Sequence, residues 1–299
     1  MRVFVTGASG WIGSAVVPEL VGAGHTVLGL ARSDEAAQAV AAAGAEVLRG
    51  SLDDLDRLEA GAAAADGVIH LAYHHDFSQM EEAAAADRRA IETMGRVLEG
   101  SGRPLLIASG TLGLAADGVA TEEDEPDPNF PRSAAAALTL ALADRGVRPI
   151  VVRLPPTVHG DGDHGFVAIL VQIARERGAS AYIGEGINCW SAVHRLDAAV
   201  VYRLALDHAP ARSVLHAVAD EGVPTRTIAE VIGRHLGLPV VSVSPEVAGE
   251  HFGWMAMMFG LDGTASSAVT RELLGWEPTH PGLVEDLELG HYFRQLEHA

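Results

Sequence analysis

The chain has 299 residues, 48% of them hydrophobic, and a formal net charge of −19, which fits one large α/β core and argues against nucleic acid and anionic membranes as partners. All 21 basic residues are arginine, so any chemistry that needs a lysine amine is excluded. Cys189 is the only cysteine, which excludes an internal disulfide. Because Met1 leads directly into a strand and no apolar run reaches about eighteen residues, we expect a cytoplasmic protein without a signal peptide or membrane span.

Residues 1–33 form the first predicted unit, a strand, a glycine-rich turn, a helix and a second strand. The apolar run Val3–Val5 is followed at once by Thr6-Gly7-Ala8-Ser9-Gly10-Trp11-Ile12-Gly13. A helical pattern follows, and a second apolar run, Thr26–Leu30, ends at Ala31-Arg32-Ser33. This order within about thirty residues predicts the βαβ unit that binds a dinucleotide.

The turn of this unit contains the residues expected to contact the diphosphate. Gly7 permits a tight turn, Gly10 leaves room for the pyrophosphate to approach the backbone, and Gly13 lets the helix pack closely on the sheet. The diphosphate is expected to lie at the helix N-terminus, against the backbone of the turn, whose remaining contact residues are Ser9, Trp11 and Ile12.

The end of the second strand predicts the choice of cofactor. NAD enzymes usually place an acidic residue there, but this chain has Arg32 and Ser33, which suit a 2′-phosphate through charge-assisted hydrogen bonds. Asp34 follows directly and weakens this argument slightly. We therefore predict NADP(H) in preference to NAD(H).

The spacing G-x-x-G-x-x-G resembles the extended branch of the short-chain dehydrogenase/reductase superfamily, the NAD-dependent epimerase/dehydratases. The resemblance implies a Rossmann-like, doubly wound parallel sheet with a smaller C-terminal α/β region for the substrate. It also implies a Ser or Thr and a Tyr-x-x-x-Lys pair acting beside the nicotinamide. A chain without lysine lacks that pair, so this is an atypical member.

The following elements alternate between strand and helix, which predicts a parallel sheet with helices on both faces. We predict a Rossmann domain over residues 1–160, with a return segment at about 190–218, and a mainly substrate-binding region over residues 161–299. The resemblance implies a homodimer that pairs through two of the helices. The predicted helices are Asp34–Ala43, Gln79–Leu98 and Ser133–Asp144, the last two being the pairing helices, and the strands are Ala45–Leu48, Gly67–Leu71, Pro104–Ser109 and Ile150–Leu154.

The resemblance also assigns cofactor contacts after the third and fourth strands. Asp53, with Leu52 before it, corresponds to the position that receives the adenine amino group; Asp53 also suits the N-cap of the helix that follows. The backbone of Leu71 and Ala72, in a His-Leu-Ala match, is expected to line the ribose.

The candidate catalytic residues follow the carboxyl ends of the strands, where open parallel sheets bind ligands. Ser109 or Thr111 is expected to hydrogen-bond the substrate, although a strand-end hydroxyl can equally cap the backbone. The position of the missing lysine falls near Arg132, which is either a ligand of the nicotinamide ribose or an exposed first-turn arginine. Ser109 and Pro155 are also predicted to contact the cofactor.

Histidines are the candidates to replace the tyrosine as proton donor. Tyr73-His74-His75-Asp76 follows the fourth strand, and we name Tyr73 and His75 as donors. The predicted substrate contacts are His74, Asp76, His159, Trp190 and His194. The histidine spacing matches no strong ligand motif, so we predict no metal.

The second half of the chain loses the regular alternation. The predicted helices are Phe166–Arg177, Asp197–Asp207, Thr225–Leu236, Glu246–Phe259 and one from Ser266, with a terminal helix after the family-like Leu274-Gly275-Trp276-Glu277-Pro278; the predicted strands are Ala181–Ile183, Leu215–Ala217 and Pro239–Val243.

These features predict an NADPH-dependent reductase of a small carbonyl-type substrate with a non-standard proton donor. Two alternatives stay open. A catalytically inactive NADP(H)-binding sensor would keep the glycines and lose the Tyr/Lys pair, whereas a sugar-nucleotide epimerase or dehydratase needs an active-site base and usually a basic pocket for the diphosphate.

Overall fold

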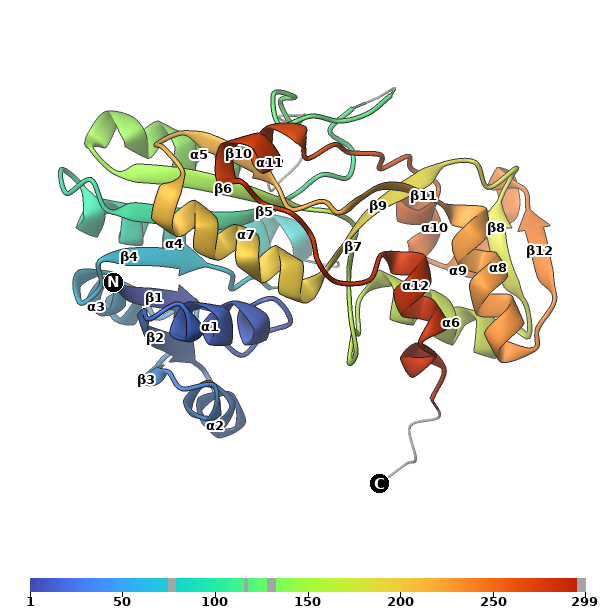
Figure 1. Cartoon of the computed structure of the whole chain (residues 1–299), viewed down its shortest axis with the longest axis horizontal. Coiled ribbons are helices and arrows are strands. Elements are labelled where there is room, and N and C mark those ends of the chain that lie inside the picture. Colours follow the sequence, from blue (N-terminus) through green and yellow to red (C-terminus); the bar gives the residue numbers. More distant parts are fainter. Residues whose placement is uncertain (75–78, 116–117, 128–132, 295–299) are drawn as a thin grey trace.

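The computed structural model describes residues 1–74, 79–115, 118–127 and 133–294. Its larger part is a seven-stranded sheet in the order β10-β6-β5-β4-β1-β2-β3, and every pair of neighbouring strands is parallel. Helices cover both faces of the sheet (Figure 1). The predicted Rossmann-like fold class is therefore confirmed. The strands are β1 Arg2–Thr6, β2 Thr26–Ala31, β3 Glu46–Arg49, β4 Gly67–His70, β5 Pro104–Gly110, β6 Arg148–Leu154 and β10 Ser213–His216.

The central strands are apolar on both faces because both faces are covered by helices. In β1, Val3 and Val5 enter the core under α1 and α7, whereas Phe4 enters the core under α3, α4 and α5. The helices of the first face are α1 Gly13–Gly22, α2 Asp34–Ala42 and α7 Arg195–His208; those of the second are α3 Leu55–Ala63, α4 Met80–Leu98 and α5 Ser133–Ala141, which continues as the 3-10 turn η2 Leu142–Arg145.

The smaller C-terminal region has its own core, built around Trp190, Ile228 and Phe259. It holds a three-stranded sheet in the order β11-β9-β7 and a parallel pair of β12 and β8. Its strands are β7 Thr157–His159, β8 Ser180–Ile183, β9 Cys189–His194, β11 Asp220–Pro224 and β12 Val240–Val243, and its helices are α6 Phe166–Arg177, α8 Thr225–Leu236, η3 Pro245–Val247, α9 Ala248–Phe252, α10 Met255–Phe259, α12 Leu283–Glu288 and η4 His291–Phe293. Helix α11 Ala268–Leu274 packs instead on α7 and β10 of the large sheet.

The chain returns to the large sheet after β9. Strand β10 pairs with β6 at the sheet edge, and α7 packs against α1. The division of the chain at residue 160 stays a prediction.

Two sequence predictions for the C-terminal region need correction. The predicted helix Glu246–Phe259 is three short pieces, η3, α9 and α10, because Gly253 adopts a φ of 58° and ends α9. The strands β7, β9 and β11 were not predicted; they pair with segments distant in the chain, which local periodicity does not reveal. Among the described residues, no helix combines the length and apolarity needed to cross a membrane.

The glycines of α1 provide a test of the close packing at its start. A Cβ at Gly13 would lie 2.1 Å from the Gly7 carbonyl oxygen, whereas a Cβ at Gly22, at the other end of the same helix, would meet nothing within 4 Å. We expect Gly13→Ala to lower the free energy of unfolding by about 1–3 kcal/mol through overpacking. Gly22→Ala is the control and should raise it by up to about 1 kcal/mol through helix propensity. Urea denaturation of both variants measures the difference; equal stabilities would contradict the packing argument.

Candidate functional site

The glycine turn between β1 and α1 packs backbone against backbone on the end of β4. Gly7 has a φ of 65°, and a Cβ there would lie 2.7 Å from the Ala72 nitrogen. Gly10 donates its N–H to the Gly7 carbonyl at 2.9 Å and, like Ser9, is exposed. The turn is thus tightly fixed on its inner side and open on its outer side, as a bound diphosphate requires.

The N-terminus of α1 suits an anion. No side chain of the described residues caps it, and its first turn holds no acidic residue, so its partial positive charge is uncompensated. Trp11 is held in place by a hydrogen bond from Nε1 to the Val158 carbonyl (2.8 Å). The Arg195 guanidinium lies 4.4 Å from the centre of the Trp11 ring and adds a cation beside the turn. These residues fit the diphosphate of a dinucleotide; Ile12 is half-buried between them and the core.

A buried hydrogen-bond chain fixes the backbone expected to line the ribose. Thr6 Oγ1 accepts the N–H groups of Leu71 and Ala72, each at 3.2 Å, and lies 2.7 Å from His70 Nδ1. His70 Nε2 lies 3.0 Å from an Asp87 carboxylate oxygen on α4. Since the carboxylate accepts from Nε2–H, His70 Nδ1 accepts the Thr6 hydroxyl proton. The chain thereby connects α4 to the end of β4.

The C-terminal end of β2 carries positive charge. Arg32 is exposed and forms no hydrogen bond or ion pair with the described residues, and the Ser33 hydroxyl caps α2 by accepting the Ala36 N–H (3.1 Å). Arg49, at the end of the adjacent β3, donates to the Ser33 carbonyl and binds the Asp34 carboxylate at 2.8 Å. The nearest carboxylate is therefore already paired, and two guanidinium groups flank Ser33.

Asp53 is not the N-cap of α3, since Asp54 occupies that position. Instead its exposed carboxylate lies 3.5 Å from His74 Nε2, so the His74 ring faces Asp53. Leu52 is buried and Tyr73 is half-buried. The adenine contact predicted for Asp53 and the substrate contact predicted for His74 stay predictions.

The ends of β5 and β6 form the candidate catalytic edge. Ser109 is half-buried, and its hydroxyl makes no hydrogen bond with the described residues. Thr111 is 1% exposed and its Oγ1 lies 3.5 Å from Ser191 Oγ on β9, so it contacts the C-terminal region. Pro155 is buried behind this edge. His75, Asp76 and Arg132, also predicted for the site, lie outside the described residues.

A buried arginine lies next to Ser109. Arg153 is paired in register with Ser109, is 4% exposed, and places Nη1 3.3 Å from His216 Nε2. Since His216 donates Nδ1–H to the Ser266 carbonyl (2.8 Å), its Nε2 accepts from Arg153. Burial lowers the pKa values of both groups, while the charges of Glu122 and Asp124 oppose that shift. The carboxylates of Glu122 and Asp124 thus act on the charge of Arg153 at the strand position that is paired with Ser109.

Three predicted substrate residues lie in or near a histidine–carboxylate cluster behind the cofactor turn. His159 and Trp190 are 0% exposed, which argues against direct contact with a substrate. His159 Nδ1 donates to Asp286 on α12 (2.9 Å), and His194 stacks on His280 with ring centres 4.7 Å apart. Burial, together with the neighbouring His159 and His280, lowers the pKa of His194 to about 4.

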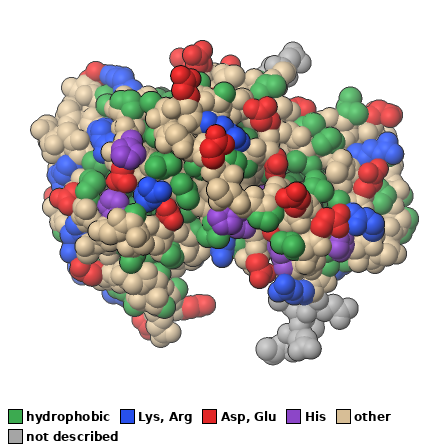
Figure 2. Space-filling view, viewed as in Figure 1, with side chains coloured by type: hydrophobic (Ala, Val, Ile, Leu, Met, Phe, Trp, Pro, Cys, Tyr) green, Lys and Arg blue, Asp and Glu red, His purple; other side chains and the backbone are tan. Residues whose placement is uncertain are grey.

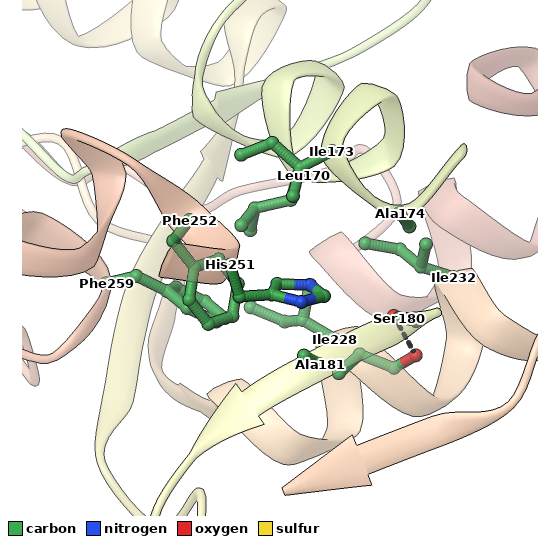
Figure 3. Close-up of a pocket in the computed structure, with 11 residues that line it drawn as sticks. Leu170, Ile173, Ala174, Ser180, Ala181, Ile228, Ile232, His251, Phe252 and Phe259 are labelled. Carbon is green, nitrogen blue, oxygen red and sulfur yellow. Dashed lines mark hydrogen bonds between the residues drawn. The ribbon is translucent and has the colours of Figure 1, made fainter. Parts of the chain in front are cut away.

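Two hollows lie elsewhere. An apolar cavity of about 10 Å³ inside the C-terminal region, with the His251 ring pointing into it, has room for about one water and is too small for a substrate (Figure 3). A surface hollow of about 290 Å³ lies on α4, η2 and their neighbours and is lined by Arg89, Arg96 and Arg145 among others. It adjoins the helices through which we predicted a homodimer, and that pairing stays a prediction. No group of three or more potential metal ligands occurs among the described residues.

Sequence reasoning missed several of these residues. Arg49 comes to Ser33 only through the pairing of β2 with β3, and Arg195 reaches Trp11 only because the chain returns to the sheet at α7. Asp87 lies within the predicted helix Gln79–Leu98, but no pattern within that helix indicates its contact with His70. The partial signal was Asp87 itself, an acidic residue at a position of the predicted helix Gln79–Leu98 that the structure buries.

Comparison with known proteins places the chain in a family. A family model described as "NAD dependent epimerase/dehydratase family" matches residues 3–216. An uncharacterised protein of Schizosaccharomyces pombe is 50% identical over 295 residues, 98% of this chain and 100% of that protein. A 4-hydroxy-2-methyl-3-oxo-4-farnesyl-3,4-dihydroquinoline-1-oxide ketoreductase of Stigmatella aurantiaca is 30% identical over 188 residues, 59% of this chain and 56% of that protein. The structure of dTDP-glucose 4,6-dehydratase from Streptomyces venezuelae matches with a TM-score of 0.77 and 18% identity, covering 96% of each chain, which shows a shared fold.

The lowered pKa of His194 predicts a pH dependence of stability. The ordinary value is 6.5 and the folded value about 4, so between these pH values the unfolded chain binds a proton that folded His194 does not. The free energy of unfolding therefore falls as the pH decreases through this window. Burial lowers the pKa values of His216 and His251 as well, which acts in the same direction.

The measurement is the melting temperature from about pH 7 to about pH 4. His194→Asn keeps an acceptor for the Leu196 N–H, which His194 Nδ1 accepts at 3.3 Å, and removes the titration. We expect a shallower slope for this variant and an unchanged slope for His208→Asn, a control at the exposed end of α7. An unchanged slope for His194→Asn would contradict the assignment.

Proposed function

The chain belongs to the NAD dependent epimerase/dehydratase family, the extended branch of the short-chain dehydrogenase/reductases, and we propose that within it the protein is an NADPH-dependent reductase of a small carbonyl compound. The family binds NAD(P). Two observations carry the proposal. Arg32 and Arg49 lie at the end of β2 and of the adjacent β3, and we call this pair the cationic corner. On the same sheet, at the end of β5, the Ser109 hydroxyl makes no hydrogen bond with the described residues.

The cationic corner supports NADPH in preference to NADH. An NAD site needs a carboxylate that accepts hydrogen bonds from the ribose hydroxyls, and the carboxylate at this position, Asp34, is bound by Arg49. Arg32 remains available for a 2′-phosphate, and the planar guanidinium suits bidentate contact with phosphate oxygens.

The distribution of arginines argues against a sugar-nucleotide substrate. A sugar nucleotide brings a second diphosphate, which needs cations in the C-terminal region. Most arginines there already bind carboxylates, and on the face shown in Figure 2 basic side chains lie beside acidic ones. The pairs in this region are Arg226–Glu230, Arg234–Glu288 and Arg294–Asp161.

The catalytic edge supports carbonyl reduction. When bound, NADPH supplies a hydride to the carbonyl carbon. The Ser109 hydroxyl donates a hydrogen bond to the carbonyl oxygen and stabilises the charge that develops there. With the family's Tyr/Lys pair missing, Tyr73 is the proposed proton donor among the described residues, because His74 faces Asp53.

Carbonyl reduction also agrees with what the distant relatives do. The Stigmatella aurantiaca relative is a ketoreductase. A protein that binds NADPH and turns over no carbonyl would instead be a sensor, and the experiments below separate the two.

The cofactor preference is tested by two variants. We expect Arg32→Ala to raise the Kd of NADPH by about 10-fold or more, because charge-assisted hydrogen bonds are lost, and to leave the Kd of NADH nearly unchanged. Arg177→Ala, which removes an exposed arginine of α6, is the control and should change neither Kd. Calorimetric titration measures both; a wild-type protein that binds NADH as tightly as NADPH would contradict the proposal.

The catalytic role of Ser109 is tested by NADPH oxidation against a panel of ketones and aldehydes. We expect Ser109→Ala to lower kcat by about 100-fold, the loss typical of one donor to a developing oxyanion, while the Kd of NADPH changes little. Ser213→Ala, at the start of β10 and so at the opposite end of the sheet, is the control. Tight NADPH binding without turnover of any panel member would favour the sensor and overturn the reductase.

A further inference from the structure

The surface hollow of about 290 Å³, which we call the arginine hollow, lies over the helices on the second face of the large sheet. Helix α4 lines it with Arg89, Glu92, Thr93 and Arg96, whose spacing of three and four residues places them on one side of the helix. The other lining residues are Leu55 of α3, Leu138 of α5 and Arg145 of η2. The hollow is therefore separate from the cofactor turn, which precedes α1 on the first face.

Two of the arginines in this lining have no carboxylate partner among the described residues. Arg89 is exposed, and its guanidinium makes no hydrogen bond or ion pair with the part of the chain that the structure describes. The guanidinium of Arg96, which is also exposed, donates from Nη2 to Thr93 Oγ1 (3.3 Å). Thr93 is 3% exposed, so this hydrogen bond holds Arg96 against a fixed point of α4.

The arginine hollow carries positive charge on a chain whose net charge is −19. Its lining holds three guanidinium groups and one carboxylate, that of Glu92. The acids beside it are engaged in other pairs, since Glu99 binds Arg145 and Asp144 binds Arg212. The charges of Arg89 and Arg96 therefore exceed what Glu92 compensates. Such a surface favours an anion, and planar guanidinium groups suit the oxygens of a phosphate.

The remainder of the lining suits a small organic group attached to the anion. Leu55 and Leu138 are half-buried and provide apolar contacts. The Glu92 carboxylate repels a phosphate but accepts hydrogen bonds from hydroxyl groups. The volume lies at the lower end of the range for small-molecule sites. These features favour a compact ligand that combines a phosphate with hydroxyl groups.

We propose that the arginine hollow binds a small phosphate monoester that carries hydroxyl groups. The phosphate lies between the side chains of Arg89 and Arg96, and a hydroxyl group of the ligand donates to Glu92. This site is independent of the reductase function proposed above, because it is built from α3, α4, α5 and η2 rather than from the cofactor turn and the end of β5.

Calorimetric titration with glycerol 3-phosphate at constant ionic strength tests the site. We expect saturable binding to the wild-type protein, and no binding of glycerol, which lacks the phosphate. Arg89→Ala and Arg96→Ala should each raise the Kd by about 10-fold or more, because charge-assisted hydrogen bonds are lost. Arg88→Ala is the matched control and should leave the Kd unchanged, since it removes the adjacent arginine of α4, which does not line the hollow.

Glu92→Gln provides a test that loss of folding does not imitate, because the expected result is tighter binding. Removing the negative charge removes the repulsion of phosphate, so inorganic phosphate should bind this variant about threefold more tightly than the wild-type protein. Equal affinity of the two proteins for inorganic phosphate would overturn the inference. Equal affinity of Arg89→Ala, Arg96→Ala and the wild-type protein for glycerol 3-phosphate would also overturn it.

Two further results would assign these observations differently. Binding of glycerol 3-phosphate that Arg32→Ala abolishes and Arg89→Ala preserves would place the phosphate at the cationic corner and overturn the inference. A dimer by light scattering that binds neither glycerol 3-phosphate nor inorganic phosphate would show that the predicted pairing of α4 and α5 covers the hollow, which would overturn it too. Neither result bears on the reductase, which is tested by NADPH oxidation.

Discussion

The contact between the glycine turn and the end of β4 is the constraint on which the site depends. At Gly7 and Gly13 the turn touches neighbouring backbone so closely that a single methyl group would collide with it. Thr6 completes the contact, since its hydroxyl oxygen accepts the N–H groups of Leu71 and Ala72 directly after β4 and its hydroxyl donates a hydrogen bond to His70 Nδ1. Backbone that is packed and hydrogen-bonded in this way has one conformation. The exposed N–H groups of the turn are therefore oriented before any cofactor arrives, and binding loses little conformational entropy.

The exclusive use of arginine affects both the fold and the chemistry. Arg103 donates to the carbonyls of Ala62, Ala65 and Val97, and Arg148 donates to those of Leu206 and Ala209, so each guanidinium binds several carbonyl groups near helix ends. A single ammonium group does not have the forked geometry for such contacts. The same permanent charge makes arginine unsuitable as a proton donor. A proton donor in this protein is therefore a group other than a basic side chain of the lysine or arginine type.

The sequence was informative where structure follows from local pattern. The alternation of apolar strands and amphipathic helices predicted the parallel, doubly wound sheet. Helices α6 and α8 have the predicted bounds, because each ends at a glycine in the left-handed conformation, Gly178 and Gly237. The cofactor turn was recognisable because its glycines are required by the backbone itself. Features that depend on contacts between distant parts of the chain were not predictable. Strand β9 pairs with β7, which precedes it, and with β11, which follows it. The buried His159 is bound to Asp286, which lies 127 residues later in the chain.

The large sheet and the C-terminal region contribute to the candidate site in different ways. The large sheet supplies the cofactor turn and Ser109, and these parts are fixed by backbone packing, which tolerates little variation. The C-terminal region reaches the same edge through side chains: Ser191 contacts Thr111, and Leu112 belongs to the C-terminal core rather than to the sheet. Side-chain contacts of this kind can be exchanged without disturbing the turn or the strands. The sheet thus fixes the glycine turn and Ser109 through backbone packing, whereas the C-terminal region adds exchangeable side-chain contacts at the same edge.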